Sequence, residues 1–165
     1  MTTLTISQTH TPSPLGDVLL AATEQGLAGV WFVHGQAHMP DTSHWVTDNA
    51  HPLLQNAAQQ LHDYFQGKRL LFELPLHTTG GTPFQRSVWQ ALQAIPYGKT
   101  QTYGDIARHM GNAQAVRAVG AAIGQNPHSI IVPCHRVVGA NGSLTGFAGG
   151  LDRKQYLLTH EATCA

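Results

Sequence analysis

The change in hydrophobic pattern across residues 78–82 constrains the fold of this chain more than any other feature. The segment Thr78-Thr-Gly-Gly-Thr82 consists of small and turn-forming residues and indicates a linker. Strand-like runs and one helix precede it, whereas short helices follow it. With 165 residues, the chain suffices for one domain or two small ones. We therefore predict an α+β fold in which a small sheet-and-helix domain, residues 1–80, packs on a mostly helical domain, residues 81–165.

The first part contains the β-rich runs. Residues 17–22 and 27–33 flank a short turn and predict a β-hairpin. Apolar side chains then recur every three or four residues over 51–66, which predicts a helix that Gly67 ends. The run 70–74 is again apolar and predicts a further strand.

The second part is helical. Thr82 followed by Pro83 is typical of a helix start, and apolar residues continue at helical spacing to Ile95. A short glycine-containing turn separates two further predicted helices, 103–110 and 115–123. This is a helix-turn-helix arrangement, although most short helix pairs bind nothing.

The composition of the second of these helices favours a role in binding. Residues 115–123 are almost all small or apolar, and Arg117 is their only charged member. A core-facing stripe does not explain the alanine and glycine at the remaining positions. Small side chains there would allow the helix backbone to approach a partner closely.

Charge is distributed unevenly along the chain. Charged residues make up only 11% of it and hydrophobic residues 42%, which excludes a disordered or coiled-coil protein. The formal net charge is zero, but residues 1–83 carry 2 basic and 6 acidic side chains and residues 84–165 carry 7 basic and 3 acidic. The basic second part is compatible with a polyanionic partner.

Cysteine usage and hydropathy indicate the compartment. Two cysteines, Cys134 and Cys164, cannot form a disulfide framework. Residues 1–14 lack the pattern of a signal peptide, and no apolar run is long enough to span a membrane. We expect a soluble cytoplasmic protein that does not bind membranes.

Cys134 is the strongest candidate for chemistry. The apolar run 129–133 ends in Pro133, and Cys134, His135 and Arg136 follow directly. A lone cysteine in an apolar run is most often inert packing. A neighbouring base or positive charge, however, favours the thiolate and makes a thiol nucleophilic.

Pro133-Cys134-His135-Arg136-Val137 resembles the active-site motif of the O6-alkylguanine-DNA alkyltransferases. The resemblance extends over about half of the chain, from Thr82 to Glu161. It includes the following blocks: Thr82-Pro-Phe-Gln-Arg-Ser-Val-Trp89, Pro96-Tyr-Gly-Lys99, Tyr103-Gly-Asp-Ile-Ala107, Val116-Arg-Ala-Val-Gly120, Asn126-Pro127, Gly146-Phe-Ala-Gly-Gly150 and Leu157-Leu-Thr-His-Glu161. The first 80 residues match only loosely, and family members would have a ribonuclease H-like domain there.

This resemblance implies a suicide repair protein. The Cys134 thiolate would attack the alkyl carbon on O6 of guanine, once per molecule and without a cofactor. His135 would take the thiol proton through a water molecule, and Glu161 would orient His135. Asn126 would fix the segment by hydrogen bonds, and Tyr103 would donate to the guanine ring as negative charge develops.

The resemblance also implies how double-stranded DNA is handled. The damaged nucleotide would be flipped out of the duplex, and the 115–123 helix would enter the minor groove. Arg117 would fill the gap left by the flipped base, and the small residues Ala118 and Gly120 would allow the close approach. Gln85, Asn112 and Tyr103 fall where family members contact the DNA backbone. The protein would act as a monomer.

Two departures from the family pattern concern the base pocket. Phe147 stands where many relatives have tyrosine, and Ala148 where some have serine, so pocket hydroxyl groups are missing. We expect activity with an altered preference among alkyl groups. Some relatives bind a structural zinc partly through cysteines of the first domain. No cysteine precedes Cys134 here, and we predict no metal.

Two other functions remain open. A non-catalytic sensor of alkylated guanine would lack the nucleophile, whereas this chain keeps Cys134. A Cys–His hydrolase would leave the helix-turn-helix and Arg117 without a role, and multiple turnover would identify it. Whether O4-alkylthymine is also a substrate stays open.

Overall fold

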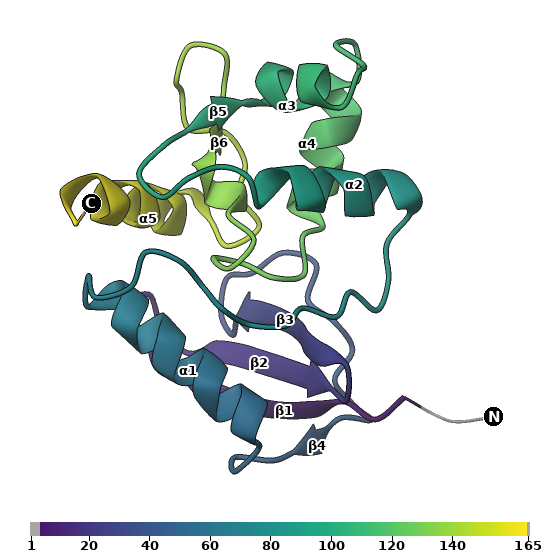
Figure 1. Cartoon of the computed structure of the whole chain (residues 1–165), viewed down its shortest axis with the longest axis vertical. Helices are drawn as coiled ribbons and strands as arrows, with labels where there is room; N and C mark the ends of the chain where they lie inside the picture. The colour runs from purple at the N-terminus through teal and green to yellow at the C-terminus, as the bar shows by residue number, and fades with distance from the viewer. Residues whose placement is uncertain (1–3, 165) are drawn as a thin grey trace.

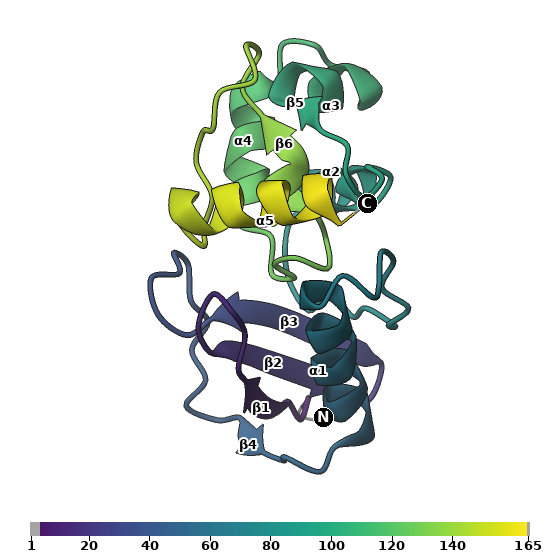
Figure 2. The same ribbon diagram turned by 90° about the vertical axis from the view of Figure 1, so that its left-hand side faces the viewer.

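The computed structural model describes residues 4–164, so Met1–Thr3 of the N-terminal segment lie outside the described part. A sheet with one helix forms the lower half of the molecule in Figure 1, and five short helical segments with a small two-stranded ladder form the upper half. Figure 2 shows the last helix lying between the two halves. The predicted α+β class, a sheet-and-helix domain packed on a mostly helical one, is confirmed.

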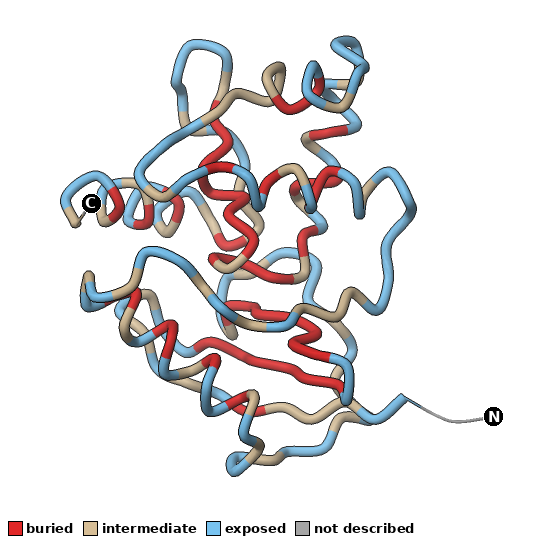
Figure 3. The backbone as a smooth tube through the Cα atoms, viewed as in Figure 1, coloured by how far each residue is buried: buried red, intermediate tan, exposed pale blue. Residues whose placement is uncertain are grey.

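A four-stranded sheet in the order β3-β2-β1-β4 forms the first half, with β1 (Ser7–Thr11), β2 (Val18–Thr23), β3 (Gly26–Phe32) and β4 (Val46–Thr47). β1, β2 and β3 are antiparallel, and β4 is parallel to β1. Every residue of β2 and β3 is buried (Figure 3). The predicted hairpin is therefore confirmed, whereas β1 was not predicted from its polar sequence.

One face of the sheet is covered by α1 (Pro52–Phe65), the helix predicted at 51–66. Gly67, at φ 75°, occupies the left-handed region directly after it, as expected for a residue that ends a helix. Leu54, Leu61 and Tyr64 point from this helix into a core shared with β2 and β3.

The strand predicted at 70–74 is wrong. The backbone of Glu73 bonds instead to the side chain of Gln60 on α1, which accepts from its N–H (2.9 Å) and donates to its carbonyl (3.2 Å). Further along the chain, Leu76 forms an isolated bridge with Leu27 of the sheet. One amide side chain therefore satisfies the backbone of Glu73, which needs no strand partner.

The second half contains α2 (Pro83–Leu92), α3 (Tyr103–His109), α4 (Val116–Gly124), the 3₁₀ turn η1 (Cys134–Arg136) and α5 (Leu151–Thr163). A parallel ladder joins β5 (Gln101–Thr102) to β6 (Val137–Val138). Thr82 caps α2 as predicted, although α2 ends at Leu92 and turns lead on to Ile95. α3 and α4 pack together as the predicted helix pair. No helix within residues 4–164 is long and apolar enough to cross a membrane.

Candidate active site

Cys134 begins the 3₁₀ turn η1 and is almost fully buried, with 3% of its surface exposed. The residues before it form turns rather than the end of a strand, contrary to the strand implied by the apolar run 129–133. This run is apolar because it lies between two cores. Ile130 packs in the core of the first half, and Val132 packs with Cys134 in that of the second.

Hydrogen bonds to β3 fix the segment that precedes Cys134. Val30 donates to the Pro127 carbonyl (2.8 Å), and its own carbonyl accepts from Ser129 N (3.1 Å). The buried His128 ring bonds through Nε2 to the Leu27 carbonyl (2.7 Å). The position of the thiol is therefore tied to an edge strand about 100 residues earlier in the chain.

Asn126 holds the same segment from within. Its Nδ2 donates to the Val132 carbonyl (3.0 Å), and its Oδ1 accepts from His128 N (3.0 Å). Between these contacts Ile130 has a φ of 73°, a left-handed conformation rare for a β-branched residue. Such strain persists where the surroundings determine the backbone, as packing in the first core and the Asn126 contacts do here.

His135 and Glu161 form the centre of a buried polar network. His135 Nε2 lies 2.8 Å from Glu161 Oε2, and both side chains are at most 1% exposed. Arg136 donates to the same carboxylate through Nε (2.8 Å) and Nη2 (3.0 Å), and Tyr64 donates through its hydroxyl (2.6 Å). His135 Nδ1 is buried and has no hydrogen-bond partner among the described residues. That nitrogen is the ring position open to a further proton-transfer partner.

Burial dominates the protonation of these groups. It raises the pKa of the Cys134 thiol, although a hydrogen bond from Asn126 and the charge of Lys154 act in the opposite direction. It likewise lowers the pKa of His135, against the effect of Glu161. Burial alone would raise the pKa of Glu161, but hydrogen bonds from His135 and Arg136 hold that pKa well below its usual range. These pKa shifts favour a neutral thiol and a neutral imidazole beside a carboxylate.

This result corrects one expectation. The sequence suggested that both His135 and Arg136 favour the Cys134 thiolate, but Arg136 bonds to Glu161 and to the Ile95 carbonyl (2.6 Å). The cation that acts on the thiol is Lys154, which the sequence analysis missed.

Lys154 is fully buried on α5, where its ammonium group donates to the Val137 (2.6 Å) and Thr145 (2.8 Å) carbonyls. Its Nζ also lies 5.9 Å from the centre of the Tyr103 ring. Burial lowers the pKa of Lys154 to about 8. The spacing of Lys154, Leu157 and Glu161 by three and four residues places them on one buried helix face, and this spacing could have revealed it.

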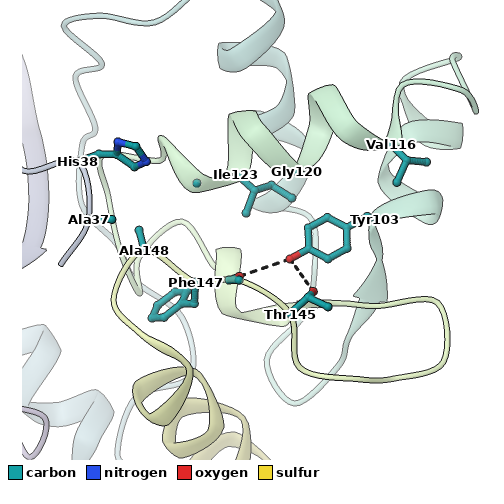
Figure 4. Close-up of a pocket in the computed structure, with 11 residues that line it drawn as sticks. Ala37, His38, Tyr103, Val116, Gly120, Ile123, Thr145, Phe147 and Ala148 are labelled. Atoms are coloured by element: carbon teal, nitrogen blue, oxygen red, sulfur yellow. Dashed lines mark hydrogen bonds between the residues drawn. The ribbon is translucent and has the colours of Figure 1, made fainter. Parts of the chain in front are cut away.

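A cavity of about 510 Å³ lies between α4 and the loop that carries Phe147 (Figure 4). Its walls come from α4, from the 145–148 loop, from Tyr103 and from two residues of the first half, and the lining residues are Ala37, His38, Tyr103, Val116, Gly120, Ile123, Gly124, Thr145, Gly146, Phe147 and Ala148. Cys134 itself is not a lining residue. Tyr103, Ile123 and Phe147 belong both to the wall and to the apolar cluster that contains Cys134.

The polar groups of the cavity are few. The Tyr103 hydroxyl accepts from Thr145 Oγ1 (3.0 Å) and donates to the Gly146 carbonyl (3.5 Å), as Figure 4 shows. Phe147 packs against both cores. A tyrosine at this position would have to pack against both cores as well. The rest of the wall is mainly apolar, which suits a flat aromatic ligand.

The predicted DNA-contacting residues do not all lie on one surface. Arg117 and Ala118 on α4 and Asn112 in the preceding turn are exposed. Gly120 faces the cavity, where an added methyl group would lie 3.9 Å from the Tyr103 ring. Gln85 is partly buried and accepts from Thr82 N (2.9 Å), so its side chain caps α2.

This geometry supports transfer of a group to sulfur. The sulfur is buried, the next residue is a histidine paired with a carboxylate, and the apolar cluster around the sulfur includes residues of the cavity wall. Fold and site thus define a class of α+β protein in which a buried cysteine packs against a helix-turn-helix. Two family models match the chain: the 6-O-methylguanine DNA methyltransferase ribonuclease-like domain over residues 6–78, and the DNA binding domain of the same family over 83–163.

Individual relatives of this chain point to the same family as the family models. A methylated-DNA–protein-cysteine methyltransferase of Methanosarcina acetivorans is 49% identical over 152 residues, which are 92% of this chain and 96% of the relative. One from Salmonella typhimurium is 57% identical over 104 residues, 63% of this chain and 61% of the relative. The crystal structure of Mycobacterium tuberculosis OGT in complex with DNA covers 97% of this chain and 94% of its own, with a TM-score of 0.86 and 42% identity. The chain belongs to the 6-O-methylguanine DNA methyltransferase family, and the family predicted from the sequence is confirmed.

Proposed function

We propose that this protein repairs DNA by transferring the alkyl group of O6-alkylguanine irreversibly to Cys134. The observation that carries the proposal is the buried Cys134 thiol. It directly precedes His135 of the His135–Glu161 pair, and it shares an apolar cluster with three residues of the cavity wall. Its relatives are named as methyltransferases that transfer from methylated DNA to a protein cysteine.

The step balances as a nucleophilic substitution. His135 accepts the thiol proton through its free Nδ1, by way of a water molecule, and Glu161 stabilises the imidazolium. The sulfur forms a bond to the alkyl carbon while the carbon–O6 bond breaks, and the electron pair of that bond stays with the guanine. Tyr103 donates a hydrogen bond to the ring as this charge develops. The thioether product has no route back, so each molecule acts once.

Burial explains why a proton relay is needed. With its pKa raised, the thiol is protonated before the lesion binds and is protected from adventitious alkylation. Asn126 holds the segment that carries the sulfur, and the positive charge of Lys154 favours the thiolate once it forms.

The target carbon lies inside a stacked duplex, so the nucleotide must be flipped into the cavity at a cost of a few kcal/mol. We propose that α4 enters the minor groove and that Arg117 occupies the gap left by the base. The small side chain of Ala118 and the absence of one at Gly120 allow the α4 backbone to approach the groove closely. Asn112, Gln85 and Tyr103 contact the DNA backbone.

The remaining expectations complete the proposal. The domain boundary lies at 80/81, within a segment that contains neither helix nor strand. The protein acts as a monomer, because one chain supplies the whole site. A free reactive thiol requires a reducing compartment, which favours the cytoplasm.

Intact-protein mass spectrometry tests the proposal. The protein is incubated with a short duplex that contains a single O6-methylguanine, and the modified peptide is then mapped. We expect one added methyl group per molecule, on Cys134, and no further turnover. Cys134→Ser should gain no mass while it still binds the lesion duplex. Tight binding by the native protein without a mass change would identify a sensor, and repeated turnover of small esters would identify a hydrolase.

A further inference from the structure

The connection between β3 and β4 extends from the first half of the molecule into the cavity wall. Ala37 and His38 belong to this connection, and the remaining lining residues lie between Tyr103 and Ala148. Figure 4 places Ala37 and His38 at the end of the cavity opposite Tyr103 and Val116. The first half of the molecule therefore contributes one end of a cavity whose other walls come from the second half.

Two hydrogen bonds hold this end in place. The Ala37 N–H donates to the Ala148 carbonyl (2.7 Å), within the loop that carries Phe147. The Gln125 amide, which directly follows α4, lies 3.2 Å from His38 Nδ1 and donates to it. His38 is thus anchored to one wall of the cavity and its neighbour Ala37 to another.

The backbone of His38 indicates that its position is determined by these contacts. Its φ is 58°, in the left-handed region, which residues other than glycine adopt infrequently. Such a conformation persists where the surrounding structure holds it. The backbone that carries the imidazole is consequently held in place at the cavity wall, although His38 is exposed to solvent.

We propose that His38 limits the size of the O6 substituent that the cavity admits, which makes a residue of the first half a determinant of specificity. This inference rests on the proposed function. With the guanine ring held at Tyr103, a methyl group needs little room beyond the base. A bulky substituent must extend along the cavity, and the wall at that end is Ala148, Ala37 and the imidazole of His38.

Single-turnover rates on two substrates test the proposal. One duplex carries O6-methylguanine and the other O6-benzylguanine, and the ratio of the benzyl rate to the methyl rate is compared among variants. Effects on DNA binding act on both substrates and cancel in this ratio. We expect His38→Gly and His38→Ala to raise the ratio about 10-fold, because contacts in an apolar pocket discriminate by this order. His38→Trp should lower it.

Three controls separate the possible outcomes. His44→Ala, at an exposed histidine of the same connection that does not line the cavity, should leave the ratio unchanged. His38→Gly also removes the strain of the left-handed φ, so agreement between the glycine and alanine variants assigns the effect to the imidazole. Thermal melting of each variant verifies that it is folded.

An unchanged ratio in both truncated variants would overturn the proposal. Equal losses on both substrates would also overturn it, since they would mean that His38 only holds its loop. Failure of the native protein to transfer either group would instead refute the proposed function, because that result does not depend on His38.

Discussion

Replacing Tyr64 by phenylalanine would remove a single hydroxyl group that links the two halves of the molecule. The hydroxyl, on α1, donates to Glu161 Oε2 on α5 at 2.6 Å, and the whole side chain is buried. Burial, followed by the nearby Glu161 charge, raises the pKa of Tyr64, so the hydroxyl remains a donor throughout the neutral range. The ring packs against Phe72 (centroids 5.4 Å apart) and Tyr97 (6.0 Å), and phenylalanine keeps these contacts.

The loss of stability in Tyr64→Phe depends on the hydrogen-bond acceptor, which is the charged Glu161 carboxylate. A hydrogen bond to a charged group contributes about 1.5–3 kcal/mol. Without the hydroxyl, Glu161 Oε2 still accepts from His135 and Arg136, so no buried charge is left unpaired. We therefore expect Tyr64→Phe to lower the free energy of unfolding by about 2 kcal/mol. For a chain of this length, the melting temperature should fall by about 4–8 °C.

Urea unfolding followed by circular dichroism measures this difference. Tyr156→Phe is the matched control, because Tyr156 is exposed on α5 and its variant should stay within about 0.5 kcal/mol of the native protein. In a Glu161→Gln background the cost of Tyr64→Phe should shrink, since a neutral amide accepts a weaker hydrogen bond. A Tyr64→Phe variant as stable as the control would refute the role of this network in joining the two halves.

Three further predictions concern DNA, pH and packing. Arg117→Ala should slow transfer from a lesion in duplex DNA about 10-fold more than transfer from free O6-benzylguanine, and equal losses would contradict a role in base flipping. Burial lowers the pKa of His128 from 6.5, so the unfolded chain binds more protons in acid. Stability should therefore fall as the pH drops through and below 6.5, and urea unfolding of His128→Gln should show a weaker pH dependence. Gly149→Ala should destabilise the protein by about 1–3 kcal/mol, because its methyl group would lie 2.7 Å from Phe147. Gly146→Ala, where an added methyl meets nothing within 4 Å, is the control in thermal melting, and equal stability would contradict this account.

Local signals explain which elements the sequence predicted. The hairpin, α1 and the start of α2 follow from residue patterns within a few positions, such as the cap at Thr82. The strand expected at 70–74 does not form: Leu70 and Leu71 are exposed, and the side chain of Gln60, 13 residues away, bonds to the backbone of Glu73. No local pattern contains that contact.

Some residues of the candidate site were predicted from the sequence, and others were found only in the structure. Resemblance to the family selected Cys134, His135 and Glu161 from the sequence. The structure places His135 Nε2 2.8 Å from Glu161 Oε2. The sequence did not single out Tyr64, Lys154 or His38. Tyr64 and His38 come from the first half, and their relevance depends on how that half packs against the second.

The sequence alone therefore determined the family, the order of the main helices and the candidate nucleophile, because these depend on residues close together or in ordered motifs. Tertiary structure alone decided the protonation and the surroundings of that nucleophile. Burial raises the pKa of Cys134 where neighbouring cations suggested a thiolate, and Arg136 bonds to Glu161 instead of facing the sulfur. The physical reason is that desolvation and long-range pairing depend on which segments meet in space, and spacing along the chain does not contain that information.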